Sequence, residues 1–392
     1  MLKLLFVHCG PLYKDVNGNY YEYSYHGLYE RYSYMADKLT FLMEVRLLEK
    51  DTENTLLDER IRVVSVPNLT KLSTFLWAYR EATRIIAREI KKADIAVLRQ
   101  CPYANIAITY CKKYGKPYIY ENVGCPWDSL WNYGWKGKII APIEFIKEKK
   151  VNFQADYVYY VTNKFLQKRY PTKGKSVGCS NVVIEAMDDL GVRKRAERIK
   201  TMLSGRKIII GTAAALDVPY KGQEYVIKAL KDLITKGYNL EYWLAGSNRK
   251  KSTYLKDMAK KFNVGGCVRF CGSLNSEEMI QFYDSLDIYI QPSKQEGLPR
   301  SVIEALSRGC LTIASNIAGN PELLDREFLF KKGNIKDIVE KVEYLLNSDL
   351  SRISNISNRN RKKANEYRID VLEQRRKGFY DDFMKKYEIM KG

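Results

Sequence analysis

Short apolar segments alternate with longer amphipathic segments along the first half of the chain. Apolar runs at 2–7, 95–98 and 157–161 have the length and composition of buried strands. Amphipathic helical patterns separate such runs, and a long one covers residues 72–92. Strands that alternate with helices of ten or more residues favour a parallel, doubly wound sheet. We therefore predict an α/β domain over residues 1–185.

The region after the first of these strands has a less regular pattern. Its apolar positions predict a helix from about 21 to 42, followed by short strands at 45–48 and 61–66. Another short strand is predicted at 117–120. These segments extend the predicted alternation of strands and helices.

The second half of the chain repeats the alternation. Strands are predicted at 207–210, 240–245, 268–270, 287–291 and 311–314, with helices between them. A charged helical segment at 187–200 precedes the first of these strands and suits a connection between domains. We predict a second doubly wound α/β domain over residues 200–365.

The most informative stretch is 291–322, which reads QPSKQEGLPRSVIEALSRGCLTIASNIAGNPE. A strand leads into a loop that contains Gly297, a helix follows, and a second strand comes after it. Ligands of parallel sheets bind outside the carboxyl ends of the strands, against a helix N-terminus. Glu296 and Glu304 flank this point. Carboxylates accept hydrogen bonds from sugar hydroxyls, and free helix amides bind phosphate, so a sugar joined to a diphosphate and a ribose would match.

The segment EGLPRSVIE also carries a resemblance to a known family. With seven residues between Glu296 and Glu304, it resembles the E-x7-E motif of family-4 retaining glycosyltransferases of the GT-B fold. The resemblance implies two Rossmann-like domains that face a central cleft, with donor in the second domain and acceptor in the cleft. It implies a hexosyltransferase that moves a hexose-type sugar from a nucleotide diphosphate to an acceptor hydroxyl with retention. It further implies that Glu296 holds the sugar hydroxyls and Glu304 the ribose.

A second match lies earlier, in the sequence GTAAALDVPYKGQ at 211–223. It resembles the diphosphate-binding loop of the family, with Lys221 beside the start of a helix, where its charge would offset phosphate. Family members commonly carry an arginine shortly before this lysine, but here alanines occupy 213–215. Arg300 either replaces that arginine or pairs with a nearby glutamate and orders the loop, and the sequence leaves both open.

These matches give a set of candidate residues. The resemblance implies that Glu296 and Lys221 are catalytic. The candidates for donor binding are Gly211, Gly222, Ser273, Gly297, Leu298, Arg300, Ser301 and Glu304.

The first domain departs from the family pattern. Many members carry a histidine after the strand that corresponds to 117–120, whereas this chain has Glu121 and Asn122. The candidates for the acceptor and cleft are Gly10, His26, Arg99, Glu121 and Asn122. His26 is equally compatible with a helix face packed on the sheet. In this fold the last helix, within 366–392, is expected to pack back on the first domain.

Composition adds constraints on ligands and partners. Eight scattered cysteines, two histidines and the lack of a D-x-D motif predict neither a metal site nor a cofactor other than the sugar donor. The formal net charge of +20 favours anionic partners such as nucleotide sugars, lipid diphosphates or an anionic membrane surface.

The segment 124–150 combines three tryptophans with a cluster of lysines. Such a mixture suits a membrane interface, but a helix packed on the core through its tryptophan face is an equal alternative. The chain shows neither a signal peptide nor an apolar run of membrane-spanning length. We expect a cytoplasmic protein, with peripheral binding to the inner face of the plasma membrane left open.

The family-level expectation is transfer to a glycan or lipid-diphosphate-linked acceptor in capsule, O-antigen or exopolysaccharide assembly. One alternative is a GT-B sugar-nucleotide epimerase, which would use the same donor pocket but needs an acid and a base in the first domain. The other is a basic nucleic-acid-binding protein. Nucleic acid is not an expected partner, because the charge is diffuse and no binding motif is present.

Overall fold

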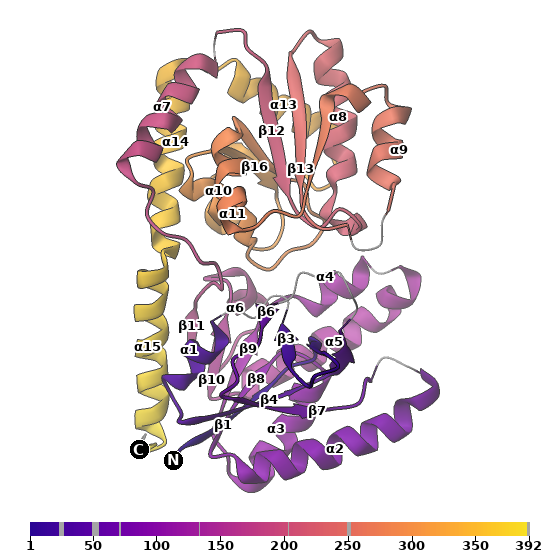
Figure 1. Ribbon diagram of the computed structural model, residues 1–392, viewed down its shortest axis with the longest axis vertical. Coiled ribbons are helices and arrows are strands. Elements are labelled where there is room, and N and C mark those ends of the chain that lie inside the picture. Colours follow the sequence, from indigo (N-terminus) through magenta and orange to yellow (C-terminus); the bar gives the residue numbers. More distant parts are fainter. Residues whose placement is uncertain are drawn as a thin grey trace.

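The chain folds into two α/β domains that lie one above the other (Figure 1). The computed structural model describes residues 1–22, 27–48, 55–69, 72–132, 134–202, 204–248 and 252–389.

The N-terminal domain is built on a parallel sheet in the order β11-β10-β9-β8-β1-β4-β7. Its strands are β1 (Lys3–Val7), β4 (Lys38–Met43), β7 (Ile61–Ser65), β8 (Ile95–Arg99), β9 (Tyr118–Asn122), β10 (Tyr157–Tyr160) and β11 (Lys175–Gly178). Consecutive residues such as Leu5 and Phe6 are both buried, because helices cover both faces of the sheet. Strands β4 and β7 lie on one side of β1, and the later strands β8 to β11 lie on the other side. The strand order therefore reverses at β1.

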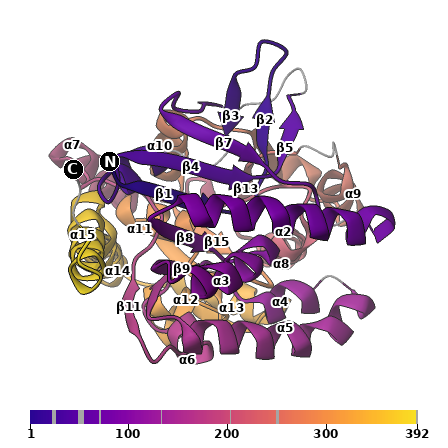
Figure 2. The same ribbon diagram turned by 90° about the horizontal axis from the view of Figure 1, so that it is seen from below.

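Helices and a small second sheet surround this sheet (Figure 2). The helices are α1 (Leu28–Ser33), α2 (Phe75–Lys92), α3 (Pro102–Tyr114), α4 (Pro126–Trp131), α5 (Trp135–Gln154) and α6 (Phe165–Arg169), with a 3-10 turn η1 (Leu72–Thr74). The small sheet consists of β2 (Leu12–Lys14), β3 (Tyr20–Glu22), β5 (Val45–Leu47) and β6 (Thr55–Leu56).

The prediction of one helix from about 21 to 42 is wrong. The described part of this region contains β3, the short helix α1 and the buried strand β4. In the sequence KLTFLM of β4, both faces of the strand are covered, so apolar residues follow one another without alternation. Such a run cannot be told from a buried helix by periodicity alone.

The C-terminal domain has its own parallel sheet, in the order β14-β13-β12-β15-β16-β17. Its strands are β12 (Ile208–Ala213), β13 (Leu240–Ala245), β14 (Val268–Gly272), β15 (Ile288–Gln291), β16 (Leu311–Ser315) and β17 (Leu329–Phe330). The strand order reverses between β12 and β15, which creates a crevice at their carboxyl ends. The predicted α/β class with two doubly wound sheets is confirmed.

The helices of this domain are α7 (Asp189–Met202), α8 (Gln223–Thr235), α9 (Tyr254–Lys261), α10 (Ser276–Ser285), α11 (Arg300–Ser307), α12 (Asn320–Leu323), α13 (Ile335–Leu346) and α14 (Leu350–Ala364). The 3-10 turns are η2 (Pro219–Lys221), η3 (Gly265–Cys267), η4 (Arg326–Phe328) and η5 (Asn365–Tyr367).

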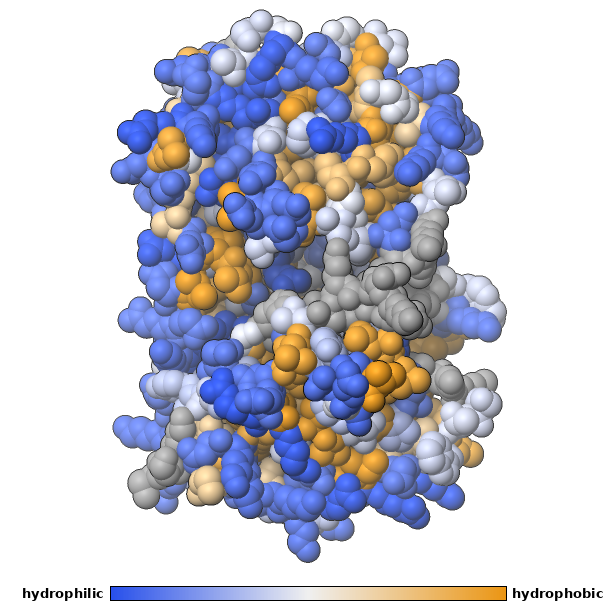
Figure 3. All heavy atoms as spheres, in the orientation of Figure 1, coloured by the Kyte–Doolittle hydropathy of each residue, from blue (hydrophilic) through white to orange (hydrophobic). Residues whose placement is uncertain are grey.

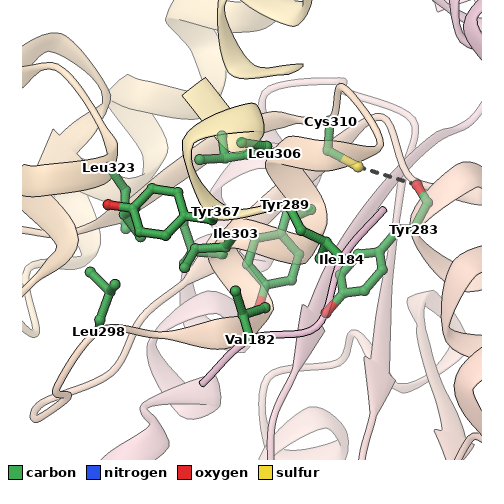
Figure 4. Packing of buried hydrophobic residues seen from close by; sticks show 14 of the residues in the cluster. Val182, Ile184, Tyr283, Tyr289, Leu298, Ile303, Leu306, Cys310, Leu323 and Tyr367 are labelled. Carbon is green, nitrogen blue, oxygen red and sulfur yellow. Dashed lines mark hydrogen bonds between the residues drawn. The ribbon is translucent and has the colours of Figure 1, made fainter. Parts of the chain in front are cut away.

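Two segments join the domains. The chain between β11 and α7 places Val182 and Ile184 against buried residues of the C-terminal domain, including Ile303 of α11 (Figure 4). The last helix, α15 (Ile369–Lys386), returns along the side of the N-terminal domain (Figure 1). There the ring of Phe383 meets Tyr157 of β10 at 5.1 Å between centroids. The carboxyl ends of both sheets consequently face each other across the domain boundary.

Candidate active site

A cavity of about 990 Å³ lies between the two domains, at the carboxyl ends of their sheets. The N-terminal domain lines it with residues that follow β1, β8 and β9 and with part of α5. The C-terminal domain contributes Tyr220, Lys221, Gln295, Glu296 and Gly297. Two predicted catalytic residues therefore face the same cavity.

The carboxylate of Glu296 is held by three donors. Lys221 Nζ donates to Glu296 Oε1 at 2.8 Å. Gln291 Nε2 and Ser293 Oγ donate to the same oxygen at 2.9 and 2.6 Å. Within the described residues, the other oxygen, Oε2, accepts no hydrogen bond. One oxygen is thus fixed by the protein, and the other is available to a ligand hydroxyl.

A glycine brings Lys221 to this carboxylate. Gly222 adopts a left-handed conformation with φ of +75°, and a Cβ there would lie 2.2 Å from the carbonyl oxygen of Pro292. Only glycine allows this close approach without strain. The backbone amide of Lys294 also donates to the Tyr220 carbonyl at 2.7 Å. The diphosphate-loop candidate and the loop of Glu296 are therefore packed directly on each other.

Glu304 lies on α11, and its carboxylate is largely buried. Tyr283 OH donates to Glu304 Oε2 at 2.8 Å. Burial raises the pKa of Glu304, while the Tyr283 hydrogen bond and the charge of Arg300 act in the opposite direction. Arg300 itself is exposed and, in the described part of the chain, its side chain forms no hydrogen bond or ion pair. Its guanidinium is free to meet an anion at the start of α11.

The other donor candidates of this loop take different positions. Ser301 Oγ donates to Gln291 Oε1 at 3.3 Å, next to Glu296. A Cβ on Gly297 would lie 3.0 Å from the carbonyl oxygen of Val123, so this glycine meets the N-terminal domain. Leu298 is buried and packs with the core residues around Ile303 (Figure 4).

Gly211 and Ser273 lie on the sheet of the C-terminal domain. Gly211 is inside β12, where the Leu286 side chain fills the space of a Cβ at 2.4 Å. Ser273 is exposed directly after β14. Packing against Leu286 already explains the glycine, and donor contacts at both positions stay predictions.

The N-terminal candidates form two buried networks. Arg99 Nε donates to Glu121 Oε2 at 2.8 Å, and Tyr32 OH donates to Glu121 Oε1 at 2.7 Å. Burial alone would raise the pKa of Glu121. The positive charges of Arg99 and Arg31 act more strongly in the opposite direction, so the pKa of this carboxyl is lowered.

The second network surrounds Glu148 of α5. Asn122 Nδ2 donates to Glu148 Oε1 at 3.0 Å, and Tyr120 OH donates to the same oxygen at 2.9 Å. Burial raises the pKa of Glu148, which also lines the cavity. Asn122 consequently reaches the site through Glu148, and direct contacts of Arg99, Glu121 and Asn122 with an acceptor stay predictions.

The remaining candidates are Gly10, which follows β1, and His26. Gly10 is half-buried, and His26 lies outside the described residues. Burial and the charge of Arg99 lower the pKa of His8 to about 3, so its imidazole is neutral. The ligand atoms of His8, Cys9 and Cys101 lie within 4.8 Å of one another, a group that could hold a metal ion. The group contains neither Lys221 nor Glu296, and the expected absence of a metal stays a prediction.

Several residues at the site were not singled out from the sequence. Gln291 and Ser293 orient Glu296, Tyr283 orients Glu304, and Glu322 connects the domains. The Glu322 carboxylate accepts hydrogen bonds from three backbone amides at the start of α6, at 2.6 to 3.1 Å. Gln291 and Ser293 precede the segment EGLPRSVIE and Glu322 follows it, so all three lie within the stretch 291–322.

Comparisons with known proteins agree with this geometry. Residues 193–366 match the family described as glycosyl transferases group 1. The chain is 32% identical to Protein CapJ of Staphylococcus aureus over 384 residues, which cover 95% of this chain and 93% of CapJ. It is 23% identical to the capsular polysaccharide biosynthesis glycosyltransferase CapM of the same species, over 54% of this chain and 55% of CapM. The structure of Anabaena HepE in complex with UDP-glucose superposes with a TM-score of 0.66 at 14% identity, and each chain is covered fully.

The fold is therefore GT-B, in which two Rossmann-like domains enclose a substrate cleft. The chain belongs to the group 1 glycosyltransferase family, and its enzymatic class is that of a glycosyltransferase.

Proposed function

We propose that this enzyme transfers a hexose-type sugar from a nucleotide diphosphate to an acceptor hydroxyl, with retention of the anomeric configuration. The donor binds in the C-terminal domain, at the crevice between β12 and β15, and the acceptor enters from the N-terminal side of the cavity. Transfer leaves a nucleotide diphosphate with additional negative charge. The protein must stabilise this charge where it develops.

The observation that carries the proposal is the Lys221–Glu296 pair at the cavity. Glu296 has one oxygen fixed by Lys221, Gln291 and Ser293. A sugar hydroxyl at the other oxygen would place the anomeric carbon reproducibly, which favours the reacting geometry. Lys221 lines the cavity and its side chain is 22% exposed, so its ammonium group could turn from Glu296 to a phosphate oxygen of a bound donor. The amides at the start of α11 and the exposed Arg300 would add to this anion site.

The relatives indicate the pathway and the donor class. CapM is named as a glycosyltransferase of capsular polysaccharide biosynthesis, and HepE was solved with UDP-glucose. By this analogy we assign a nucleotide-diphosphate sugar as donor. The acceptor is assigned as a glycan on a lipid diphosphate, in the assembly of a bacterial surface polysaccharide.

A lipid-linked acceptor would require contact with a membrane. No helix in the described ranges is long and apolar enough to cross a bilayer. On α5, however, Ile139, Ile143 and Ile146 are all exposed, and their spacing puts them on one face. Lysines at positions 136, 138, 147, 149 and 150 accompany this face. We propose that the α5 face binds an anionic membrane surface, on the cytoplasmic side.

The segment 124–150 could pack its tryptophans on the core or expose them at a membrane interface, and the three tryptophans differ in this respect. Trp127 stacks on Trp131 at 5.1 Å and meets Phe145 edge-on at 5.8 Å, so it contributes to packing. Trp131 and Trp135 are exposed, and lysine ammonium groups lie over both rings. The face of the molecule drawn in Figure 3, which is not centred on α5, is mostly hydrophilic with small groups of hydrophobic residues.

Vesicle sedimentation tests the membrane proposal. The protein should bind anionic vesicles more strongly than neutral ones, and added salt should weaken the binding. Ile143→Asp with Ile146→Asp should abolish it, whereas Ile280→Asp, an exposed isoleucine of α10 in the other domain, should not. Equal partitioning to both vesicle types would contradict the proposal.

Donor binding and turnover test the central reaction. A thermal-shift series against nucleotide sugars should identify one that raises the melting temperature, because a ligand of the folded state stabilises it by mass action. The anomeric configuration of the product, determined by NMR, should equal that of the donor. Release of free nucleotide diphosphate with formation of a glycosidic bond would favour transfer. Conversion of the donor sugar into its epimer, without formation of a glycosidic bond, would contradict the proposed transfer and favour the epimerase alternative.

A further inference from the structure

A second hollow of about 420 Å³ lies next to the acceptor side of the active-site cavity. It is bounded by the first turns of α2, the outer face of α3 and Lys147 of α5. Its apolar lining consists of Leu69, Phe75, Tyr79, Pro102, Ile106 and Tyr110. We call this hollow the α2–α3 groove.

The α2–α3 groove is continuous with the active-site cavity. Leu69, Pro102, Asn105 and Lys147 line both hollows. A ligand that occupies the groove can therefore extend past these four residues toward Glu296. This continuity indicates a single elongated substrate with an apolar part and a polar part.

The charges of the groove favour an anionic ligand. Among the described residues that line it, none is a carboxylate, and Lys147 is the charged one. Its ammonium group lies 3.2 Å from Glu144 Oε1, in an exposed pair on successive turns of α5. Exposed pairs of this kind contribute little and exchange partners readily. Glu144 and Glu148 line the adjoining cavity, so a phosphate at the point where the groove meets the cavity would bind Lys147 in competition with Glu144.

The surroundings of the groove are apolar as well. Leu76 and Trp77 of α2 are exposed beside it, and on α5 the Ile143 and Ile146 residues are 64% and 67% exposed. The N-terminal ends of α2 and α5 project from the same side of the domain, with α3 between them (Figures 1 and 2). A bilayer at this side would contact both helices and deliver a lipid chain to the groove.

We infer that the α2–α3 groove binds the first part of the hydrocarbon chain of a lipid diphosphate. The diphosphate lies near Lys147, and the group attached to it points into the active-site cavity. The inference rests on the proposed function for the identity of the attached sugar. Binding of the chain itself is a property of the groove alone.

Farnesyl diphosphate, used below its micelle concentration, is a suitable probe. Calorimetry would be performed on the full chain with UDP in excess, so that the donor site does not bind the probe's diphosphate. We expect saturable binding to the wild type. Affinity should fall at least about tenfold in Phe75→Glu and in Tyr79→Glu, because a carboxylate would then face the chain. Leu76→Glu, an exposed residue of the same helix outside the groove, is the matched control and should bind as the wild type does.

The contribution of Lys147 is tested separately. Lys147→Glu should weaken binding of farnesyl diphosphate and leave binding of farnesol unchanged. Equal losses for both probes would overturn the placement of the diphosphate. Absence of wild-type binding, or equal affinity in all α2 variants, would overturn the groove as the chain site.

The two proposals fail in different ways. Saturable, groove-dependent binding of the probe by a protein that transfers no sugar would refute the proposed function only. Efficient transfer to a lipid-free glycan acceptor, without any binding of the probe, would refute the groove only.

Discussion

Two ion pairs at the carboxyl ends of the two sheets have the same length and opposite surroundings. Arg99–Glu121 in the N-terminal domain and Lys221–Glu296 in the C-terminal domain both span 2.8 Å. The side chains of the first pair are 8% and 1% exposed, whereas those of the second are 22% and 10% exposed. Glu121 also has both oxygens engaged, while Glu296 has all its donors on one oxygen.

The difference separates a pair that maintains the fold from a pair that can exchange partners with a ligand. A buried charge that loses its partner cannot be solvated, so the first pair is fixed. Lys221 retains access to solvent and to the cavity, so a phosphate can replace Glu296 as its partner. Distance alone would not have distinguished the two.

The largest expected effect is on stability, from Glu121→Ala. It removes the carboxylate that pairs with the buried Arg99 at 2.8 Å and should lower the free energy of unfolding by about 3–5 kcal/mol. Urea unfolding followed by circular dichroism measures it. Glu296→Ala is the comparison. It should lower the free energy of unfolding by less than about 1 kcal/mol, since the ammonium group of Lys221 can then be solvated by water. Similar losses in the two variants would remove the distinction between the pairs.

The next effect concerns turnover. Lys221→Ala should reduce kcat about 10²–10³-fold at saturating donor, because a charge that stabilises the leaving diphosphate is lost. Its unfolding free energy should stay close to that of the wild type. Lys294→Ala is a control, since Lys294 pairs with Glu224 at 2.8 Å nearby and does not line the cavity. Equal rates in both lysine variants would exclude the role of Lys221.

Glu304→Ala should weaken donor binding by about 1.5–3 kcal/mol, the range for a hydrogen bond to a charged group. Calorimetry with the nucleoside and with the nucleoside diphosphate should show the same loss, because the predicted contact is to the ribose. Tyr283→Phe keeps the carboxylate and removes only its orienting hydroxyl, so its loss should be smaller. Unchanged affinity in Glu304→Ala would place the ribose elsewhere.

Arg300 should have a smaller effect, because its side chain is exposed. A phosphate contact predicts that diphosphate affinity falls about tenfold in Arg300→Ala and less in Arg300→Lys, with nucleoside affinity unchanged. Equal losses for nucleoside and diphosphate would indicate that Arg300 orders the loop instead.

The smallest effect is a dependence of stability on pH. Because burial raises the folded-state pKa of Glu304, its ionised form destabilises the fold at pH values above that pKa. As pH falls through the folded pKa toward the ordinary value of 4.5, this destabilisation is relieved. Glu304→Gln should therefore stabilise the protein most at neutral pH, and the gain should shrink in acid. A gain that grows in acid would contradict the burial effect.

Much of the C-terminal site follows from contiguous sequence. The strand, loop and helix of residues 288–307 are consecutive, and local turn chemistry places Glu296 and Glu304 on either side of a helix start. The alternation of strands and helices likewise predicted both sheets. Local patterns suffice where the interacting residues are neighbours in the chain.

Local patterns failed at 21–42, where burial on both faces of β4 removed the alternation that identifies a strand. They also could not pair residues that are distant in sequence. Lys221 and Glu296 are 75 positions apart, and Tyr283 reaches Glu304 across 21 positions. Which acidic groups are paired, buried or available depends on how the sheets and helices pack.

The sequence by itself therefore determined the α/β class, the two domains and the chemical character of the loop predicted to bind the donor, because hydrophobic periodicity and turn residues act locally. Only the tertiary structure decided that Glu121 is enclosed by Arg99 and Tyr32 while Glu296 stays accessible beside Lys221. It also decided that an apolar groove opens into the cavity. Burial is set by every element packed around a side chain, and no single segment of the chain contains that information.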